Sequence, residues 1–370
     1  MQPDKKFINY QITKLEQLLL KKRSFYRVDL HLHTNYSVDG LQTVEQAIEN
    51  ANKMRFDIIS IADHDTISAY DEIVDRKLYR GEDVPIIIPG VEFTVSYPAY
   101  EGRCHVLKYF YDANDQRILN LISENRAAFN NRVNIWFKRI EENKCLNFYT
   151  NMFDITFSVD DYWKFIKKKG ETVPDYPTIV EYIYSQLCKH GISIWDVYNK
   201  AVAFNELDPC ITRKLKKISA LKRFYDKYSD KEISTNYRKL KPILAPLGID
   251  DDDFPEYESS GSLSVNEYGQ IPILKLINSG INVLAHPDIK KLNCIDELLE
   301  VSCIAGVEIN WHNQQYANNL VYQKAKDVSA LITRGSDKHS YKSDEYDDLE
   351  FYDMSYEELR AFVWRIKQYC

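Results

Sequence analysis

A seven-residue alternating segment, Arg27-Val-Asp-Leu-His-Leu-His33, constrains the fold more than any other part of this chain. Strict alternation of apolar and polar residues predicts a β-strand, in which neighbouring side chains point to opposite faces. The three apolar residues share one face, and Asp29, His31 and His33 share the other. Residues two apart lie about 6.6 Å apart along a strand, so both histidines can reach one bound ion. Asp29, one step deeper, is a candidate acceptor that fixes a histidine tautomer.

Two stretches of the chain, residues 27–112 and 271–345, alternate short apolar runs with amphipathic segments. This alternation predicts parallel βαβ units, in a small barrel or an open sheet. After the first strand, Thr43 and Gln46 form a capping-box pattern that predicts a helix. Further strands are predicted at residues 56–62, 85–95, 105–111, 281–285, 306–310 and 330–333, with a helix at 272–279.

The intervening part of the chain shows mainly helical patterns, at residues 119–142, 177–190 and 194–203. We interpret it as an inserted helical cap domain. A second capping box, Ser355 with Glu358, predicts a C-terminal helix. The predicted organisation is an N-terminal segment at 1–26, a barrel at 27–112 and 271–345, the insertion at 113–270 and the C-terminal helix at 346–370.

Composition excludes several classes of protein. The 370 residues include 48 basic and 55 acidic ones, so bulk positive charge does not hold this chain on nucleic acid or a membrane. No run of 18 apolar residues is present, and residues 1–7 lack the apolar part of a secretion signal. Seven scattered cysteines without a CxxC motif are typical of reduced thiols. We therefore expect a cytoplasmic protein.

The placement of the histidines carries most of the functional information. Six of the eight lie in, at the end of, or just past a predicted strand: His31, His33, His64, His105, His286 and His339. Carboxylates lie near most of them, and Glu92 and Glu308 lie within strands. Ligands collect at the carboxyl ends of strands in parallel α/β folds. Imidazoles and carboxylates on one rim suit zinc, manganese or iron.

Seven short motifs, in this order along the chain, resemble those of the PHP (polymerase and histidinol phosphatase) family of phosphoesterases. They are Asp29-Leu-His31-Leu-His33-Thr-Asn-Tyr-Ser-Val-Asp39-Gly40, Ala62-Asp63-His64-Asp65, Pro89-Gly-Val-Glu92, His105-Val-Leu, Ala285-His286-Pro287, Gly306-Val-Glu308 and Gly335-Ser-Asp337-Lys-His339. The resemblance implies an α/β fold, a distorted (β/α)7 barrel, with two or three divalent metal ions (manganese, iron or zinc) at its rim.

The resemblance also implies a set of metal ligands: His31, His33, Asp39, His64, Glu92, His105, His286, Asp337 and His339. Glu92 is the expected bridging carboxylate. The insertion most resembles the branch that hydrolyses nucleoside bisphosphates or trims RNA from its 5′ end. Two features depart from the family: one extra residue before Asp39, and Asp175-Tyr-Pro177-Thr178 where that branch often has an Arg-Pro-His-like motif.

The expected chemistry follows from the metal ions. Paired ions generate a hydroxide near neutral pH and bind phosphoryl oxygens as charge develops on them, so no serine or cysteine nucleophile is needed. We therefore assign Ser37 and Ser336 to turns. The candidate catalytic residues are His64, Asp65 and Asp337, with His64 or Asp65 as the general acid. The candidate phosphate-binding residues are Arg126, Arg132 and Arg334.

Residues 211–245 contain eleven Lys or Arg against three acids, with four aromatic residues interleaved. Such a stretch could bind phosphates and stack on exposed bases. We favour the simpler interpretation, a solvated helix face with tyrosines packed beneath it. His312 and His190 are placed outside the ligand set, and His190 is expected to cap a helix.

Three hypotheses remain from the sequence. The first is a metal-dependent phosphoesterase acting on a nucleotide or a short single-stranded oligonucleotide. The second is a phosphatase for a small ester such as histidinol phosphate, or a hydrolase of another bond on the same scaffold. The third is a non-catalytic module that binds metal or nucleotide. No membrane partner is expected, and the sequence leaves the oligomeric state open.

Overall fold

The computed structural model describes two units, each presented here by itself. The first unit comprises Met1–Ala128 and Tyr257–Cys370, and the second comprises Phe129–Glu256. The described residues are 5–37, 40–81, 83–96, 103–109, 116–142, 152–169, 176–193, 196–197, 199–200, 271–272, 276, 280–287, 292–300, 304–311, 313, 315–339 and 349–369.

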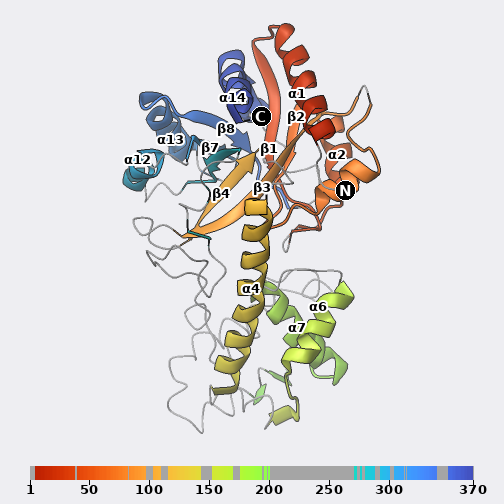
Figure 1. Ribbon diagram of the computed structural model, residues 1–370. Helices are drawn as coiled ribbons and strands as arrows, with labels where there is room; N and C mark the ends of the chain where they lie inside the picture. Colours follow the sequence, from red (N-terminus) through yellow and green to blue (C-terminus); the bar gives the residue numbers. More distant parts are fainter. Residues whose placement is uncertain are drawn as a thin grey trace. The chain divides into compact units, whose positions relative to one another are not determined.

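A mixed nine-stranded sheet forms the centre of the first unit (Figure 1). Its strands are β1 (Phe25–Leu32), β2 (Ile58–Ile61), β3 (Ile86–Ser96), β4 (Arg103–Tyr109), β5 (Ile271–Pro272), β6 (Ile281–Leu284), β7 (Gly306–Asn310), β8 (Leu331–Gly335) and β9 (Asp353–Ser355). Their order in the sheet is β8-β7-β6-β4-β3-β2-β1-β9, with β5 beside β3. The seven strands predicted from the sequence are confirmed, as β1 to β4 and β6 to β8.

The direction of β4 departs from the prediction. Strands β1, β2 and β3 are mutually parallel, as are β6, β7 and β8, but β4 runs antiparallel to both β3 and β6. The expectation of parallel βαβ units is therefore wrong at this strand. The reason is the short connection of residues 97–102, because a parallel crossover needs a dozen or more residues.

Hydrogen bonds between the end of β1 and the residues after β8 nearly close the sheet into a barrel. The His33 N–H donates to the Lys338 carbonyl at 3.0 Å, and the Asp337 N–H donates to the His31 carbonyl at 2.9 Å. Strand β9 pairs with the other end of the same edge of β1, where Phe25 lies opposite Ser355. The fold class predicted from the sequence, a distorted α/β barrel, is confirmed.

A buried carboxylate reinforces this closure. Asp29 accepts hydrogen bonds from the Ser336 N–H at 3.0 Å, the Ser336 hydroxyl at 2.7 Å and the His31 N–H at 3.3 Å. Sequence reasoning assigned Asp29 to a histidine ring. The structure instead uses it to join β1 to the residue that follows β8.

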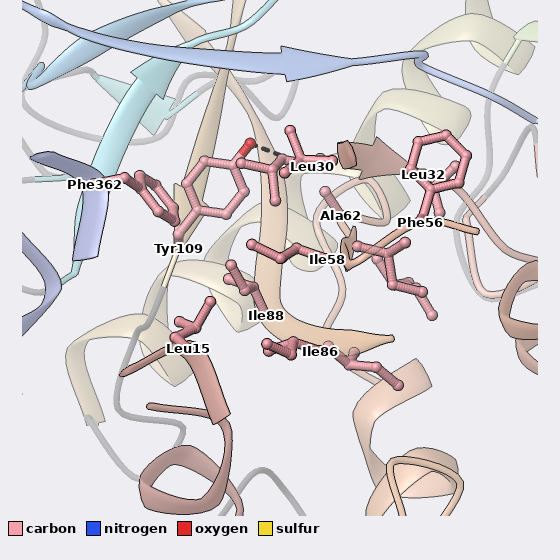
Figure 2. Close-up of a cluster of buried hydrophobic side chains, with 14 of the residues drawn as sticks. Leu15, Leu30, Leu32, Phe56, Ile58, Ala62, Ile86, Ile88, Tyr109 and Phe362 are labelled. Atoms are coloured by element: carbon pink, nitrogen blue, oxygen red, sulfur yellow. Dashed lines mark hydrogen bonds between the residues drawn. The ribbon is translucent and has the colours of Figure 1, made fainter. Parts of the chain in front are cut away.

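Helices α1 (Lys5–Leu20) and α14 (Tyr356–Tyr369) pack on the barrel beside α2 (Val44–Lys53) and α3 (Ala69–Asp75) in one hydrophobic cluster. Figure 2 shows Leu15 of α1 and Phe362 of α14 in this cluster, with the Tyr109 hydroxyl donating to the Leu30 carbonyl at 2.9 Å. Burial of these side chains supplies the main driving force for folding. A second cluster joins the sheet to α12 (Leu292–Glu300) and α13 (Gln315–Asp327).

Both predicted capping boxes are present. The Gln46 N–H donates to the Thr43 hydroxyl at 3.2 Å, and the Thr43 N–H donates to the Gln46 side chain at 2.9 Å. Ser355 and Glu358 make the equivalent pair at the start of α14, after the short 3-10 helix η7 (Leu349–Tyr352). The predicted helix at 272–279 is wrong at its first residue, which lies in β5; residues 273–275 and 277–279 lie outside the described part.

The second unit contains α6 (Val159–Lys169) and α7 (Tyr176–Lys189), and α4 (Gln116–Glu142) continues into it from the first. Tyr162 packs its ring against Phe137 and Tyr182, each at 5.5 Å between centroids. The helices predicted at 119–142 and 177–190 are confirmed, and His190 caps α7 by donating from Nδ1 to the Gln186 carbonyl at 2.8 Å. The basic stretch 211–245 lies outside the described residues.

We predict that Ser336→Ala weakens barrel closure. The change removes one hydrogen bond to a buried carboxylate, which should lower the free energy of unfolding by about 1.5–3 kcal/mol. Urea denaturation followed by circular dichroism measures this change. The control is Ser24→Ala, at an exposed serine before β1. An equal, small effect of both substitutions would contradict the role given to Asp29.

Candidate metal centre

One rim of the barrel collects the predicted ligands from six places in the sequence. His31 and His33 lie at the end of β1, His64 follows β2, Glu92 lies in β3, His105 lies near the start of β4, His286 follows β6, and Asp337 and His339 follow β8. The reversed direction of β4 explains why His105 comes early in its strand, whereas the other histidines come at or after strand ends. Side chains that are far apart in the sequence therefore lie together at this rim.

The carboxylate of Glu92 occupies the centre of this rim and is fully buried. Its Oε2 lies 3.2 Å from His31 Nε2, 3.2 Å from His33 Nε2 and 3.1 Å from His64 Nδ1. Its Oε1 lies 3.0 Å from His105 Nδ1 and 3.2 Å from His286 Nε2. Although three ring nitrogens surround Oε2, it accepts no hydrogen bond from the described residues. Donor atoms that face one another in this way suit a shared cation.

Asp337 supplies a second carboxylate to the same cluster. Its Oδ1 lies 3.1 Å from His33 Nε2, 3.5 Å from His31 Nε2 and 3.8 Å from His339 Nε2. The rings of His33 and His339 stack, with 4.4 Å between centroids and planes 6° apart. The cluster therefore has donor atoms beyond those around Glu92.

These donors form three overlapping groups, within each of which the ligand atoms lie no more than 4.8 Å apart. The groups are His31, His33, Glu92 and Asp337; His64, Glu92 and His105; and His33, His64 and His339. Atoms bound about 2.1 Å from one ion lie about 3–3.5 Å from each other, as many of these do. The residues fit more than one divalent ion, with Glu92, His33 and His64 shared between groups.

Glu308 is a functional residue to which sequence reasoning gave no role. Its Oε1 lies 2.9 Å from His31 Nδ1, so Nε2 of that ring is left for the cluster. Its Oε2 accepts the His286 N–H at 2.8 Å and the Asn310 side chain at 3.2 Å. A carboxylate within a strand, in Gly306-Val-Glu308, was the available signal.

The backbone around the cluster is locally constrained. Asp65, His286 and Asp337 have φ angles of +50°, +28° and +53°, in the left-handed region that side chains rarely adopt. Gly335 needs to be glycine, since a Cβ there would collide with the Glu308 carboxylate and the His31 side chain. Such constraints fix the direction in which the ligands point.

Electrostatic interactions keep the cluster charged despite burial. Burial opposes ionisation of Glu92, but the imidazoles of His64 and His31 hold its pKa well below the usual range. Burial likewise disfavours charge on His31, and Glu308 and Glu92 nevertheless raise its pKa well above 6.5. His105 is dominated by burial, which lowers its pKa to about 4. In the absence of cations, protons on imidazoles therefore balance the carboxylates.

The remaining predicted site residues lie elsewhere or outside the described part. Both carboxylate oxygens of Asp65 accept hydrogen bonds from Thr94, from its N–H and its hydroxyl, each at 3.2 Å, and burial raises the Asp65 pKa to about 7. Asp39 and His312 fall outside the described residues, as do the side chains of Arg126 and Arg132.

The structure does not bring Arg334 to the cluster, contrary to its prediction as a phosphate ligand. Strand alternation turns its side chain away from the face on which Gly335 contacts His31. Its Nη2 lies 3.5 Å from Glu358 of α14. The prediction used charge and proximity in sequence and did not consider the face of the strand.

Comparison with protein families matches residues 29–194 to the model of the PHP domain. The 5'-3' exoribonuclease Rnm of Escherichia coli (strain K12) is 28% identical over 114 residues. That match covers 31% of this chain and 38% of the relative, so this chain spans well under half of that protein.

Two solved structures resemble the chain. One, a candidate metal-dependent phosphoesterase from Bifidobacterium adolescentis, has a TM-score of 0.51 at 19% identity, covering 92% of this chain and 96% of that one. The other, an amidohydrolase from Chromobacterium violaceum, has a TM-score of 0.48 at 16% identity over 89% of this chain and 98% of that one. The first supports the fold described above.

We predict that Glu308→Gln weakens metal binding. Glutamine keeps the shape but removes the charge that orients His31, and changes to such supporting residues typically cost about 10–100-fold in metal affinity. Titration calorimetry with Mn²⁺ measures the dissociation constant. Glu297→Gln, at an exposed position of α12, is the matched control. Equal affinities in the two variants would show that Glu308 does not position the cluster.

Metal affinity should rise with pH. A histidine binds a metal only after losing its proton, and the carboxylates hold the pKa of His31 and of His286 above 6.5 despite burial. Protons therefore compete with the cation below those raised values. We expect tighter Mn²⁺ binding at about pH 8 than at about pH 6, with net proton release in calorimetry across buffers of different ionisation enthalpy. Affinity independent of pH would contradict this electrostatic description.

Proposed function

We propose that this chain, whose residues 29–194 match the PHP domain, is a phosphoesterase that hydrolyses a phosphate ester of a nucleotide or short single-stranded oligonucleotide. One observation carries the proposal: Glu92 lies buried within 3.2 Å of ring nitrogens from five histidines. Together with Asp337, this donor set suits two or three divalent ions. The E. coli exoribonuclease that resembles part of this chain supports a nucleic-acid substrate.

The proposed ligands are those that the structure brings together, with Asp39 as a further candidate outside the described residues. They are His31, His33, His64, Glu92, His105, His286, Asp337 and His339. These residues would hold divalent cations, which would supply Lewis acidity and an activated water near neutral pH. Manganese, iron and zinc all suit such ligands. Positive charge at the rim also explains how a chain of net charge −7 attracts an anionic substrate.

The protein side chains orient this chemistry and move protons. Glu308 holds the His31 ring through Nδ1. The Ser37 hydroxyl links the His33 ring to the His64 backbone: it lies 3.2 Å from His33 Nδ1 and accepts the His64 N–H at 3.2 Å. His64 is partly exposed, with 18% of its side chain accessible, so it is the better candidate to protonate a leaving oxygen. Asp65 is less suited to that role because Thr94 occupies both of its oxygens.

No helix in the described part of the chain is long and apolar enough to cross a membrane. We propose a cytoplasmic site of action, which fits seven scattered cysteines without a CxxC motif.

A substrate panel tests the proposal. Manganese-loaded protein should release phosphate from a nucleoside 3′,5′-bisphosphate or mononucleotide from 5′-phosphorylated single-stranded RNA, faster than it dephosphorylates histidinol phosphate. Asp337→Asn should reduce turnover and bound metal by more than the about 10–100-fold expected for a supporting residue. Asp327→Asn, at the exposed end of α13, should change neither.

Three outcomes would contradict this assignment. Full turnover in Asp337→Asn would remove the metal cluster from the reaction. Preference for histidinol phosphate would replace the substrate class with a small phosphomonoester. Stoichiometric metal without turnover on any phosphate ester would leave only a non-catalytic binding module.

A further inference from the structure

Two buried aspartates flank His64, and their carboxylates have no part in the proposed chemistry. Asp63 is 1% exposed and Asp65 is 5% exposed, although carboxyl groups are seldom buried without partners. The partner that each carboxylate shares with the other is of the same kind, a threonine that donates both its backbone N–H and its hydroxyl. These two pairs are called the first clamp and the second clamp.

The first clamp joins the residue after His33 to the residue before His64. The Asp63 carboxylate accepts the Thr34 N–H at 2.6 Å and the Thr34 hydroxyl at 2.8 Å. Both histidines lie beyond the ends of β1 and β2, so these side-chain hydrogen bonds continue a connection that the backbone makes within the strands. The clamp therefore holds two ligands of the histidine group, which consists of His33, His64 and His339.

The second clamp joins the residue after His64 to β3. Asp65 accepts the Thr94 N–H and the Thr94 hydroxyl, each at 3.2 Å. Thr94 lies two residues after Glu92, on the same face of β3, and it pairs directly with His105 of β4. Residues that lie opposite each other in an antiparallel pair are neighbours on one face of the sheet. This clamp therefore adjoins every ligand of the glutamate group, which consists of His64, Glu92 and His105.

The backbone around His64 also needs support from its surroundings. Asp65 has a φ angle of +50°, in the left-handed region, and such a conformation persists only where neighbouring contacts hold it. The Asp65 N–H donates to the Glu92 carbonyl at 2.9 Å, and the Glu92 N–H donates to the Asp63 carbonyl at 3.2 Å. The two clamps add side-chain contacts on either side of His64.

We propose that the two aspartates beside His64 are positioning residues, each for a different divalent ion. The first clamp positions His64 for the ion of the histidine group, and the second positions it for the ion of the glutamate group. The remaining group, of His31, His33, Glu92 and Asp337, does not include His64, so it keeps its ion without either clamp. This inference rests on the metal cluster of the proposed function and is independent of substrate and turnover.

The experiment counts the Mn²⁺ ions bound to the full chain, by equilibrium dialysis and elemental analysis over a range of free Mn²⁺. Thr34→Val removes the hydroxyl of the first clamp, Thr94→Val removes that of the second, and valine keeps the shape of the side chain. We expect each variant to bind one ion about 10–100-fold more weakly, the range for residues that support a ligand. The double variant should bind two ions more weakly.

Conservative and remote variants serve as controls. Thr34→Ser and Thr94→Ser keep the hydroxyl and should retain the affinity of the unmodified protein. Thr13→Val, on the exposed side of α1, should also bind as the unmodified protein does. Circular dichroism verifies that each variant folds. A valine variant that does not fold is replaced by Thr34→Ala or Thr94→Ala, which leaves room for a water at the buried carboxylate.

Clamps that only stabilise the fold would leave the affinity for every ion unchanged in the valine variants, and this result would overturn the proposal. Loss of affinity in the serine variants would also overturn it, as would a double variant that weakens only the ion weakened by each single change. An unmodified protein that binds no Mn²⁺ would overturn both this inference and the proposed function. If the proposed function alone is wrong, the ion counts follow the expectation but no phosphate ester is hydrolysed.

Discussion

The buried carboxylate of Glu92, among ring nitrogens of five histidines, is the interaction on which the rest of the structure depends. A charge without exposed surface is costly unless partners compensate for it. Those partners come from β1 and β4 and from the residues after β2 and β6, so the cluster forms only when the barrel has assembled. The hydrogen bonds between β1 and the segment after β8 then bring Asp337 within 3.1 Å of His33. The site is therefore complete only when the barrel is closed.

The antiparallel β4 is part of the same requirement. In an all-parallel barrel, a residue as early in its strand as His105 would lie at the rim opposite to His31 and Glu92. Reversal of the strand places its beginning at the ligand rim, where His105 Nδ1 lies 3.0 Å from Glu92 and 3.2 Å from His286. The antiparallel direction of β4 thus brings His105 to the cluster, which a parallel strand would not do. The short connection before β4 makes this reversal necessary.

Local patterns in the sequence predict much of this arrangement. Alternation across Arg27–His33 predicts that His31 and His33 share a face, and their Nε2 atoms lie 3.0 Å apart. Capping boxes at Thr43 and Ser355 are equally local and are confirmed. Long-range partners are not encoded locally: Glu308 lies 277 positions from the His31 ring that it orients, and Asp29 bonds to Ser336, 307 positions away. Sequence reasoning assigns the histidine ring to Asp29, whereas in the structure Glu308 meets it.

Arg334 shows how strand parity could have corrected one prediction. Gly335 lies against His31 and Glu308 on the inner side of the wall, so the residue before it has to face outward. Asp337 lies beyond the end of β8, with a φ angle of +53°, and it also faces the inner side, where it meets His33. Parity within β8 therefore places Gly335 on the inner side and the Arg334 guanidinium on the outer side of the wall. Counting residues along the strand thus separates an arginine that adjoins a metal motif in sequence from the face that carries the ligands.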